Sequence, residues 1–459
     1  MSSSESASAA ATVPTTSTSA TSPTAATAAP GAPLSLPLPS RLSVPLPSDA
    51  ADAVLPPGTR VTPGQPLLRE TAGAAHVPLA PVAGVVRGVT QVQLLGGRGS
   101  ETAALEIDVD LTAPPPEPRP AADGEAAVAT VASPTDVPTL IDRLRECGVR
   151  ASRACSPDLL AQLHEAVRRP IDTVLCSLMD AAGGSALSAV VLRTMGKELL
   201  AGLETIGRVT GASRIWLVAD SNIINRASAL VRKSGSGARI KVIELENDYP
   251  QADPTLMLYA LLGRKLRPGR LPTEVNTILF DGAAAGAVGR AAQRGEPMLE
   301  VPIEVRDSAQ SRSTVYTAAV GLPVRFLLDA AGLRGGRAEL TLRAGAALRD
   351  VRIGGDDAVV DGGGELSIDA GPPSPPINPD PCIRCGWCVE ACPVRIHPAG
   401  LLEAAQDNDP EMAERYGLHA CIECGICSYV CPSRLPLLPG IRELRRRNLA
   451  TDGAPMRTA

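Results

Sequence analysis

Two short runs of cysteines near the end of the chain carry the residue types best suited to redox chemistry. Both runs follow the spacing C-x2-C-x2-C-x3-C-P, and together they hold eight of the eleven cysteines in 459 residues. The cysteines are Cys382, Cys385, Cys388, Cys392, Cys421, Cys424, Cys427 and Cys431. Because four thiolates can hold one iron–sulfur cluster, the two runs predict two 4Fe–4S clusters.

The ligands of each predicted cluster come from both runs. This spacing is the pattern of bacterial ferredoxins with two clusters, in which three cysteines wrap one cluster and the fourth ligates the other. The expected sets are Cys382, Cys385, Cys388 and Cys431 for one cluster, and Cys392, Cys421, Cys424 and Cys427 for the second. Gly386 and Gly425 occupy the same place in each run, where the backbone must pass close to the inorganic core.

Other uses of clustered cysteines fit this chain less well. Disulfide frameworks are typical of small secreted domains, but this chain is long, and its N-terminus lacks the basic start and apolar core of a secretory signal. Zinc sites usually pair two separated C-x2-C units, which leaves the third cysteine and the C-P step unexplained. The remaining Cys147, Cys155 and Cys176 are scattered, and we expect them to be buried free thiols in a reducing compartment.

Composition excludes several classes of function. The formal net charge is −5, and the chain has only four histidines. No basic stripe is interleaved with aromatic residues, so no nucleic-acid partner is expected. No apolar stretch reaches the roughly 18 residues that would span a bilayer. No residue is a candidate for acid–base or nucleophilic catalysis. His397 and His419 flank the cysteine runs, and we expect them to face solvent or to bond to the loops rather than to act as ligands.

Segments of biased composition mark the expected domain boundaries. Residues 1–33, rich in Ala, Ser, Thr and Pro, cannot bury enough surface to offset their ordering entropy, so a disordered tail is expected. Residues 112–136 and the Pro-rich segment 371–380 are expected to be linkers, the latter stiff and extended. The remaining expected units are folded domains at 34–111, 137–298, 299–370 and 381–449, and a flexible tail at 450–459.

The two middle domains differ in their expected secondary structure. Residues 137–298 alternate strand-like runs, such as RIWLVAD from Arg214, with helical runs, and this alternation predicts a largely parallel sheet in a doubly wound, Rossmann-like α/β core. Within it, the glycines of GAAAGAVG from Gly282 are expected to serve helix–sheet packing. Residues 299–370 predict a small β-rich domain with one or two helices. The fold class is therefore an α/β multidomain protein.

The C-terminal segment is expected to be helical outside the cysteine runs. Between them, PAGLLEAAQ and DPEMAERYG predict two helices, with Pro398 in a first turn and Asp409 as an N-cap. These helices predict an α-helical two-cluster ferredoxin module. The basic tail IRELRRRNL, from Ile441, is a partly amphipathic helix. It could touch anionic lipid or an acidic partner, or simply present a solvated charged face.

The N-terminal domain, residues 34–111, resembles the barrel-sandwich hammerhead of biotinyl and lipoyl carriers. The resemblance rests on PPGTRVTPGQPLL followed by VPLAPVAGVV, in which short apolar pairs alternate with Pro-Gly and Gly turns typical of antiparallel strands. Those carriers need a lysine at a hairpin tip, and none occurs between residues 34 and 111. A docking or structural role is therefore expected for this domain.

The chain as a whole resembles the C subunit of the Rnf ion-translocating electron transport complex. The resemblance is most specific in the segment from CIRCGWC to IRELRR, and YPQADPTLMLYALLGRKLRPGRLPTEV, from Tyr249 to Val275, is similar to that subunit's α/β core. It spans most of residues 34–449. It implies a hammerhead domain, an α/β core, a small β-grasp-like domain and the cluster module, in that order.

The resemblance implies an electron-transfer subunit of a membrane-bound oxidoreductase of the ferredoxin/NAD type. Such a subunit would lie peripherally on the cytoplasmic face of the inner membrane, with only indirect contact to the bilayer. Its implied partners are the integral membrane and other subunits of the complex, together with ferredoxin. The alternative is a soluble flavin-dependent reductase that relays electrons to a bound corrin or another acceptor.

The α/β core departs from the family where a flavin would bind. Family members carry a G-x-G-G-A-x-F-P loop, whereas this chain reads ECGVRASRACSPDLLAQL, in which Gly148 is the only glycine. Phosphate recognition at a helix start depends on such glycines. The family's N-G-A-E-C-E-P is also replaced, by SLMDAAGGSAL from Ser177. Weak or absent binding of FMN and NADH is therefore expected, unless Arg150, Arg153 and the DAAGGSAL turn build a substitute site.

Overall fold

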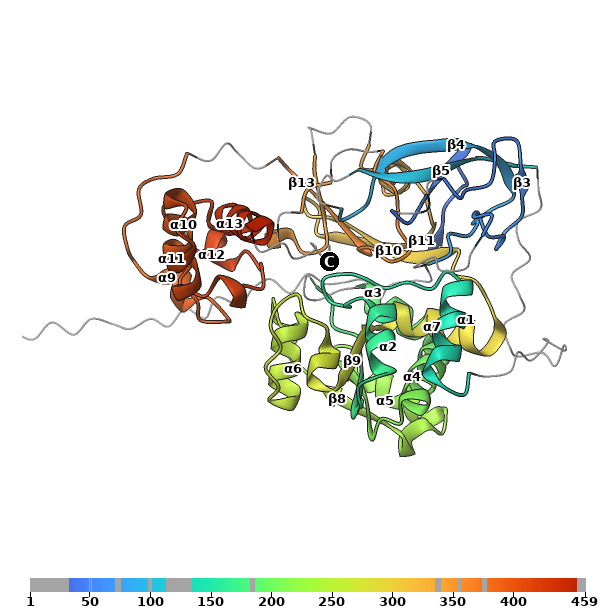
Figure 1. The fold of residues 1–459 in the computed structure, drawn as a ribbon, viewed down its shortest axis with the longest axis horizontal. Helices are drawn as coiled ribbons and strands as arrows, with labels where there is room; N and C mark the ends of the chain where they lie inside the picture. Colours follow the sequence, from blue (N-terminus) through green and yellow to red (C-terminus); the bar gives the residue numbers. More distant parts are fainter. Residues whose placement is uncertain are drawn as a thin grey trace, which may run out of the picture.

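The computed structural model describes the chain from Pro33 to Thr451, with internal gaps. The residues left out are 1–32, 49, 51, 71–75, 98–100, 113–133, 182–185, 335–339, 350, 354–356, 374–377 and 452–459. The expected N-terminal tail, most of the linker 112–136, part of the linker 371–380 and most of the C-terminal tail therefore lie outside the described residues. Figure 1 shows three groups of elements: a β-rich region, a core of helices and strands, and a helical module to one side.

The core contains a four-stranded parallel sheet in the order β8-β7-β6-β9. The strands are β6 (Thr173–Ser177), β7 (Arg214–Ala219), β8 (Ile240–Glu244) and β9 (Thr277–Asp281). Every residue of β6 and β9 is buried, as expected for strands covered on both faces by helices. The parallel α/β core predicted from alternating strand and helix patterns is confirmed.

Helices surround this sheet, and the green part of Figure 1 shows most of them. They are α1 (Val137–Glu146), α2 (Leu159–Ala166), α3 (Ala186–Thr194), α4 (Gly196–Thr210), α5 (Ile224–Lys233), α6 (Pro254–Leu262) and α7 (Gly282–Arg294). Aspartates cap several of them: Asp136 accepts from the N–H of Thr139 at 2.9 Å, and Asp281 accepts from that of Ala284 at 2.8 Å. Helices α3 and α4 follow each other directly and are separated only by Met195.

Helices α4 and α7 approach each other through glycines. A Cβ atom added to Gly202 would collide with the carbonyl oxygen of Ala285, and one added to Gly289 would collide with that of Glu198. Backbone atoms cannot move aside as a side chain can, so only glycine allows this approach. The packing role predicted for the glycines of GAAAGAVG is confirmed at Gly289, although its partner is helix α4 rather than the sheet.

Two further sheets contain the N-terminal strands and those that follow the core. An antiparallel sheet has the order β2-β5-β4-β3, and a mixed five-stranded sheet has the order β1-β11-β10-β13-β12. The strands are β1 (Leu34–Ser35), β2 (Arg41–Pro45), β3 (Arg60–Val61), β4 (Gly84–Gln93), β5 (Glu101–Val109), β10 (Glu300–Asp307), β11 (Arg312–Ala319), β12 (Thr341–Ala344) and β13 (Ser367–Gly371), accompanied by helix α8 (Val324–Ala330). Strand β1 pairs with β11, so the first described residues reach the second sheet and not the first.

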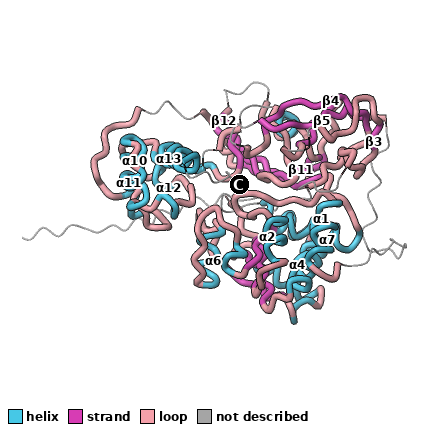
Figure 2. Tube along the Cα trace, viewed as in Figure 1, coloured by secondary structure: helices cyan, strands magenta, loops and turns pink. Residues whose placement is uncertain are grey.

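The C-terminal module is helical, as Figure 2 shows, and its buried apolar side chains form a hydrophobic core of their own. Its helices are α9 (Trp387–Glu390), α10 (Pro398–Asp407), α11 (Pro410–Arg415), α12 (Ile426–Tyr429) and α13 (Leu437–Thr451). The two helices predicted between the cysteine runs are confirmed as α10 and α11. Asp409 accepts from the N–H of Met412 at 2.9 Å and Pro410 opens the helix, as predicted.

The basic groups of helix α13 are engaged within the module. Arg442 and Arg445 donate to the buried carboxylate of Glu423 at 2.9 Å and 2.6 Å, and Arg445 also donates to the carbonyl oxygen of Cys421 at 2.7 Å. Arg446 and Arg447 both pair with Glu443. This arrangement favours a structural role for the helix over the contact with anionic lipid that the sequence left open.

The module contacts the core through its second cysteine run. The hydroxyl of Tyr249 donates to the carbonyl oxygen of Cys424 at 2.5 Å. A Cβ atom added to Gly425 would collide with the carbonyl oxygen of Leu348. The next residue, Arg349, pairs with buried Asp253 at 3.0 Å, which holds this segment against the core. The second cysteine run therefore packs against Tyr249 and Leu348, which come from segments distant in the sequence.

We predict that Gly289→Ala destabilises the core. The added methyl group would collide with the backbone of α4, and overpacking of this kind costs about 1–3 kcal/mol. Gly237→Ala is the matched control, because a Cβ atom there has no neighbour within 4 Å. Calorimetric unfolding should show a lower midpoint for Gly289→Ala alone. Equal midpoints would contradict the close approach of α4 and α7.

We also predict that alanine is tolerated differently at the two equivalent glycines of the cysteine runs. Both have φ of +81°, so alanine costs roughly 1–2 kcal/mol at either position. Only at Gly425 would the methyl group also strike Leu348, since nothing lies within 4 Å of a Cβ atom at Gly386. Thermal unfolding of the cluster-loaded protein should therefore be lowered more by Gly425→Ala than by Gly386→Ala. The reverse order would show that the module does not sit on Leu348.

Candidate functional site

The two cysteine runs have matching backbones. In each run a glycine with φ of +81°, Gly386 or Gly425, precedes a short helix, α9 or α12. The residue before the second cysteine, Arg384 or Glu423, also has positive φ, near +55° in both. Helices α9 and α12 pack against each other. The repeat seen in the sequence is therefore a structural repeat whose two halves lie side by side.

The thiols of the first run have a neighbour from the second. Burial raises the pKa of Cys388, and the thiols of Cys431 and Cys382 raise it further. Cys431, which is distant in the chain, thus acts electrostatically on a thiol of the first run. These three cysteines belong to one of the two predicted ligand sets.

The thiols of the second run have a neighbour from the first. Burial raises the pKa of Cys427 to about 12, and the thiols of Cys421, Cys424 and Cys392 contribute to the rise. Burial also raises the pKa of Cys424, with a further contribution from Cys392. Metal ligation requires thiolates, so bound iron would have to offset this cost of losing the proton.

The residues of the module fit iron–sulfur clusters, because its eight cysteines supply the four thiolates that each of two clusters needs. Each thiolate of a 4Fe–4S cluster binds a different iron, so its ligands are spread around a larger core. A zinc site would instead need four ligands on one ion. The module could therefore hold clusters through its eight cysteines.

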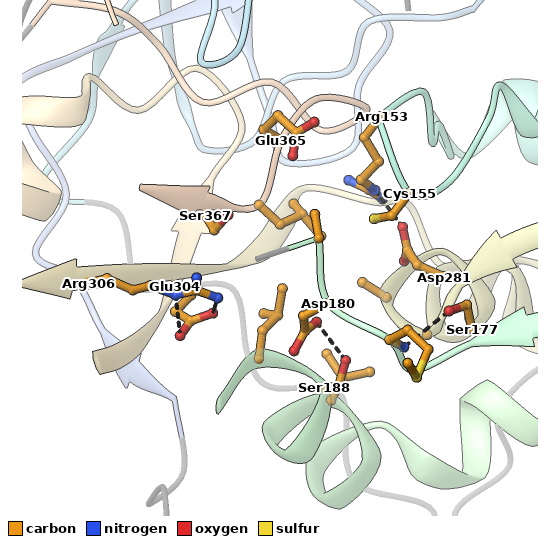
Figure 3. Close-up of a pocket in the computed structure, with 17 residues that line it drawn as sticks. Arg153, Cys155, Ser177, Asp180, Ser188, Asp281, Glu304, Arg306, Glu365 and Ser367 are labelled. Atoms are coloured by element: carbon orange, nitrogen blue, oxygen red, sulfur yellow. Dashed lines mark hydrogen bonds and ion pairs between the residues drawn. The ribbon is translucent and has the colours of Figure 1, made fainter. Parts of the chain in front are cut away.

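A second candidate site lies in the core, beyond the carboxyl ends of strands β6 and β9 (Figure 3). Ligands of open parallel sheets usually bind at this edge. The charged groups that line the pocket are Arg153, Asp180, Asp281, Glu304, Arg306 and Glu365. Four carboxyl groups therefore face two guanidinium groups, a balance that does not favour an anionic ligand.

The loop that replaces the family's glycine-rich segment is closed by internal bonds. The buried Arg153 donates through Nε to Asp281 at 2.5 Å and through a terminal nitrogen to the carbonyl oxygen of Gly364 at 2.7 Å. The N–H of Ala154 donates to the carboxylate of Glu365 at 3.2 Å. The guanidinium group of Arg153 and the N–H of Ala154 could have donated to a phosphate, but they donate to acceptors of the chain itself.

The other parts of the expected substitute site do not supply free cationic groups. Arg150 pairs with Asp361, and its second terminal nitrogen lies 2.5 Å from His76. Helix α2 begins at the side chain of Asp158, which accepts from Ala161 and places a carboxylate where a phosphate would sit. Of the DAAGGSAL turn, residues 182–185 lie outside the described residues.

The pKa of Asp180, which lines this pocket, is raised above its ordinary value. Desolvation raises its pKa to about 7, and the neighbouring carboxylate of Glu304 adds to the rise, although Ser188 donates to Asp180 at 2.8 Å. Glu304 itself is buried and accepts two bonds from Arg306, each of 3.0 Å. An FMN phosphate here would meet fixed carboxylates and paired arginines, so the residues present do not fit this cofactor.

The structure also places the remaining residues considered in the sequence. Cys147 and Cys176 are buried and Cys155 is partly buried; all three are free. The Nδ1 atom of His397 accepts from the N–H of Gly400 at 2.8 Å, as expected for a histidine bonded to a loop, and His419 is exposed. Sequence reasoning missed the docking role of Tyr249, for which no local signal exists.

Two known protein families match this chain, one in the C-terminal module and one in the α/β core. Residues 374–433 match the family described as "4Fe-4S dicluster domain", and residues 160–290 match the "Nuo51 FMN-binding domain". The second match begins after the loop that contains Arg153. The C-terminal module thus matches a 4Fe–4S dicluster domain, and the core matches a flavin-binding domain, although the described residues of its pocket do not fit an FMN phosphate.

Individual relatives carry consistent names. The C subunit of an "Ion-translocating oxidoreductase complex" of Edwardsiella ictaluri is 25% identical over 92% of this chain and 52% of its own length. The C subunit of a "Na(+)-translocating ferredoxin:NAD(+) oxidoreductase complex" of Acetobacterium woodii is 22% identical over 48% of this chain and 49% of its own length. For a solved chain of an NAD+-reducing [NiFe]-hydrogenase, the TM-score is 0.42 and the identity 13%, over 71% of this chain and 56% of that one.

The chain spans about half the length of the curated relatives that it matches. The match to the Edwardsiella relative nevertheless extends over 429 residues, and the family matches fall in the segments that the sequence analysis singled out. The predicted resemblance of this chain to the C subunit of Rnf-type ion-translocating oxidoreductase complexes is therefore confirmed.

Proposed function

We propose that the chain is an electron-transfer subunit of a membrane-bound, ion-translocating oxidoreductase of the ferredoxin/NAD type. The observation that carries this proposal is the C-terminal module, which contains both cysteine runs and matches a 4Fe–4S dicluster domain. When bound, 4Fe–4S clusters accept and donate single electrons. The chain's own residues hold the clusters, shield the second set from water and orient the module against the core.

The proposed ligands follow the sequence prediction. They are Cys382, Cys385, Cys388 and Cys431 for the first cluster and Cys392, Cys421, Cys424 and Cys427 for the second. The mutual effects on pKa within the sets of Cys388 and Cys427 support this division.

The chain is further proposed to attach to its membrane indirectly, on the cytoplasmic face. Among the described residues no helix is both long and apolar enough to cross a bilayer. Integral and other subunits would then supply the membrane contact, and ferredoxin would be a further partner. A barrel-sandwich hammerhead at 34–111 and a β-grasp-like domain at 299–370 remain our proposals for the two β-rich parts, with the other boundaries as predicted from the sequence.

The core is proposed to have lost its flavin function. The ion pair of Arg153 with Asp281 and the bond from Ala154 to Glu365 use the donors that a phosphate would need. The chain would then relay electrons between partners without oxidising NADH itself. The same pocket argues against the alternative of a soluble flavin-dependent reductase.

Cluster content tests the proposed function. Anaerobically reconstituted protein should contain about eight iron and eight acid-labile sulfide atoms per chain. Cys431→Ser should damage the cluster of Cys382, Cys385 and Cys388, whereas Cys147→Ser, outside the runs, should leave both clusters intact. Electron paramagnetic resonance of the reduced variants distinguishes the two clusters. Zinc in place of iron, or selective loss of the other cluster in Cys431→Ser, would refute the assignment.

Flavin titration tests the proposed loss of the nucleotide site. Each missing charge-assisted bond costs roughly 1.5–3 kcal/mol, so two missing bonds weaken FMN binding by about a hundredfold or more. Titration followed by flavin fluorescence should therefore show no saturation at micromolar protein. Glu365→Gln, which removes the carboxylate from the N–H of Ala154, should bind FMN more tightly than the wild type. Stoichiometric binding by the wild type would overturn the proposal and restore an NADH-oxidising role.

A further inference from the structure

Largely buried arginines lie beside the second cysteine run. Arg442 and Arg445 pair with Glu423 from within the module. Arg349 comes from outside the module, and its side chain is only 14% exposed. The arginines in and directly after the two runs are instead exposed: Arg384, Arg395 and Arg434. Because water and salt screen the charges of exposed groups, the charge of Arg349 acts on its surroundings with much less screening.

The contacts of Arg349 and its neighbours attach it to the second run. The carbonyl oxygen of Leu348, the preceding residue, lies directly against Gly425. The hydroxyl of Tyr249 donates to the carbonyl oxygen of Cys424 at 2.5 Å, and Arg349 is hydrogen-bonded to the Tyr249 side chain. The backbone before Arg349 and its side chain therefore both reach the loop that carries Cys424.

The guanidinium group of Arg349 is only partly satisfied by the chain. A terminal nitrogen donates to Asp253 at 3.0 Å, but the buried Nε atom has no hydrogen-bond partner among the described residues. Two further buried donors without a partner, Gln251 Nε2 and Arg442 Nη2, belong to segments that adjoin the same run. Unpartnered buried donors are rare and costly. A cluster bound at this run would bring sulfur acceptors to the region where these donors gather.

The charge of Arg349 is felt at a proposed ligand of the second cluster. Burial raises the pKa of Cys424, and the guanidinium of Arg349 acts in the opposite direction. Reduction adds one negative charge to an iron–sulfur cluster, and the reduction potential responds to nearby charge, to hydrogen bonds and to solvent exposure. Burial therefore disfavours reduction at this run, whereas a neighbouring guanidinium group favours it.

We propose that Arg349 raises the reduction potential of the second cluster, an inference that rests on the proposed function. Burial at the second run disfavours the extra negative charge, and the guanidinium group of Arg349 offsets this penalty. One electron can then leave the first cluster, which is oxidised, and enter the second, which is reduced. No bond breaks and no proton moves in this step. Asp253 limits the effect, because its carboxylate opposes the charge of its partner Arg349.

The test measures the midpoint potentials of both clusters in the full, cluster-loaded chain, by mediated redox titration followed by electron paramagnetic resonance. Arg349→Met removes the charge at a similar side-chain length, and Arg349→Lys restores the charge. Asp253→Asn removes the opposing carboxylate but keeps an acceptor for the N–H of Thr255 at the start of helix α6. Arg294→Met is the matched control, because it breaks another largely buried ion pair, that of Arg294 with Glu198 in the core.

We expect Arg349→Met to lower the potential of the second cluster by about 59 mV or more, which is a tenfold shift of a one-electron equilibrium. Asp253→Asn should raise the same potential, and Arg349→Lys should lie close to the wild type. Arg294→Met should change neither cluster. Opposite shifts in the two partners of one ion pair identify an electrostatic effect, because damage to the packing would shift both variants in the same direction.

The inference would be overturned by an unshifted second cluster in Arg349→Met, by shifts of the same sign in Arg349→Met and Asp253→Asn, or by an equal shift in Arg294→Met. A potential in Arg349→Lys as low as that in Arg349→Met would also overturn it. If Arg349→Met loses the second cluster, Asp253→Asn decides: a raised potential supports the inference, and an unchanged one makes Arg349 purely structural. A wild-type chain without two clusters would instead refute the proposed function.

Discussion

Gly425 lies directly against the carbonyl oxygen of Leu348, at a distance that admits no side chain on the glycine. This contact seats the helical module on the rest of the protein, and the bond from Tyr249 to Cys424 reinforces it. Because the contact engages the second run, Cys421 and Cys424 are buried, whereas Cys382 and Cys385 at the equivalent positions of the first run are exposed. This contact therefore decides which of the two proposed clusters lies against the rest of the protein and which lies nearer the surface.

The two cysteine runs are also coupled to each other within the module. Helices α9 and α12 of the two runs pack against each other, and each proposed ligand set takes one cysteine from the other run. Helix α13 adds to this coupling, because Arg442 and Arg445 reach the buried Glu423 in the second loop. A buried carboxylate with two guanidinium partners is well satisfied, whereas loss of either partner would leave a costly charge.

The fold of the core does not depend on a bound flavin phosphate. Its parallel sheet and the close pair α4 and α7 depend on apolar strands and glycines, which a phosphate does not touch. In the pocket beside the sheet, Arg153 pairs with Asp281, and the N–H of Ala154 donates to Glu365. These buried polar groups therefore have partners within the chain.

The spacing of the cysteines and the periodicity of the apolar residues were enough to predict several elements of this protein. The cysteine runs predicted the cluster module, the alternation around RIWLVAD predicted the parallel sheet, and Asp409 with Pro410 predicted the start of α11, because each signal is local in the chain. Tertiary structure decided the rest. The exposure of Ile383 against the burial of Ile422 could not be read from two runs of the same spacing, since Leu348 and Tyr249 come from distant segments. Likewise, Arg153 looked available for an anion until the fold brought Asp281 to it across 128 positions, because a charge's partner depends on packing and not on sequence proximity.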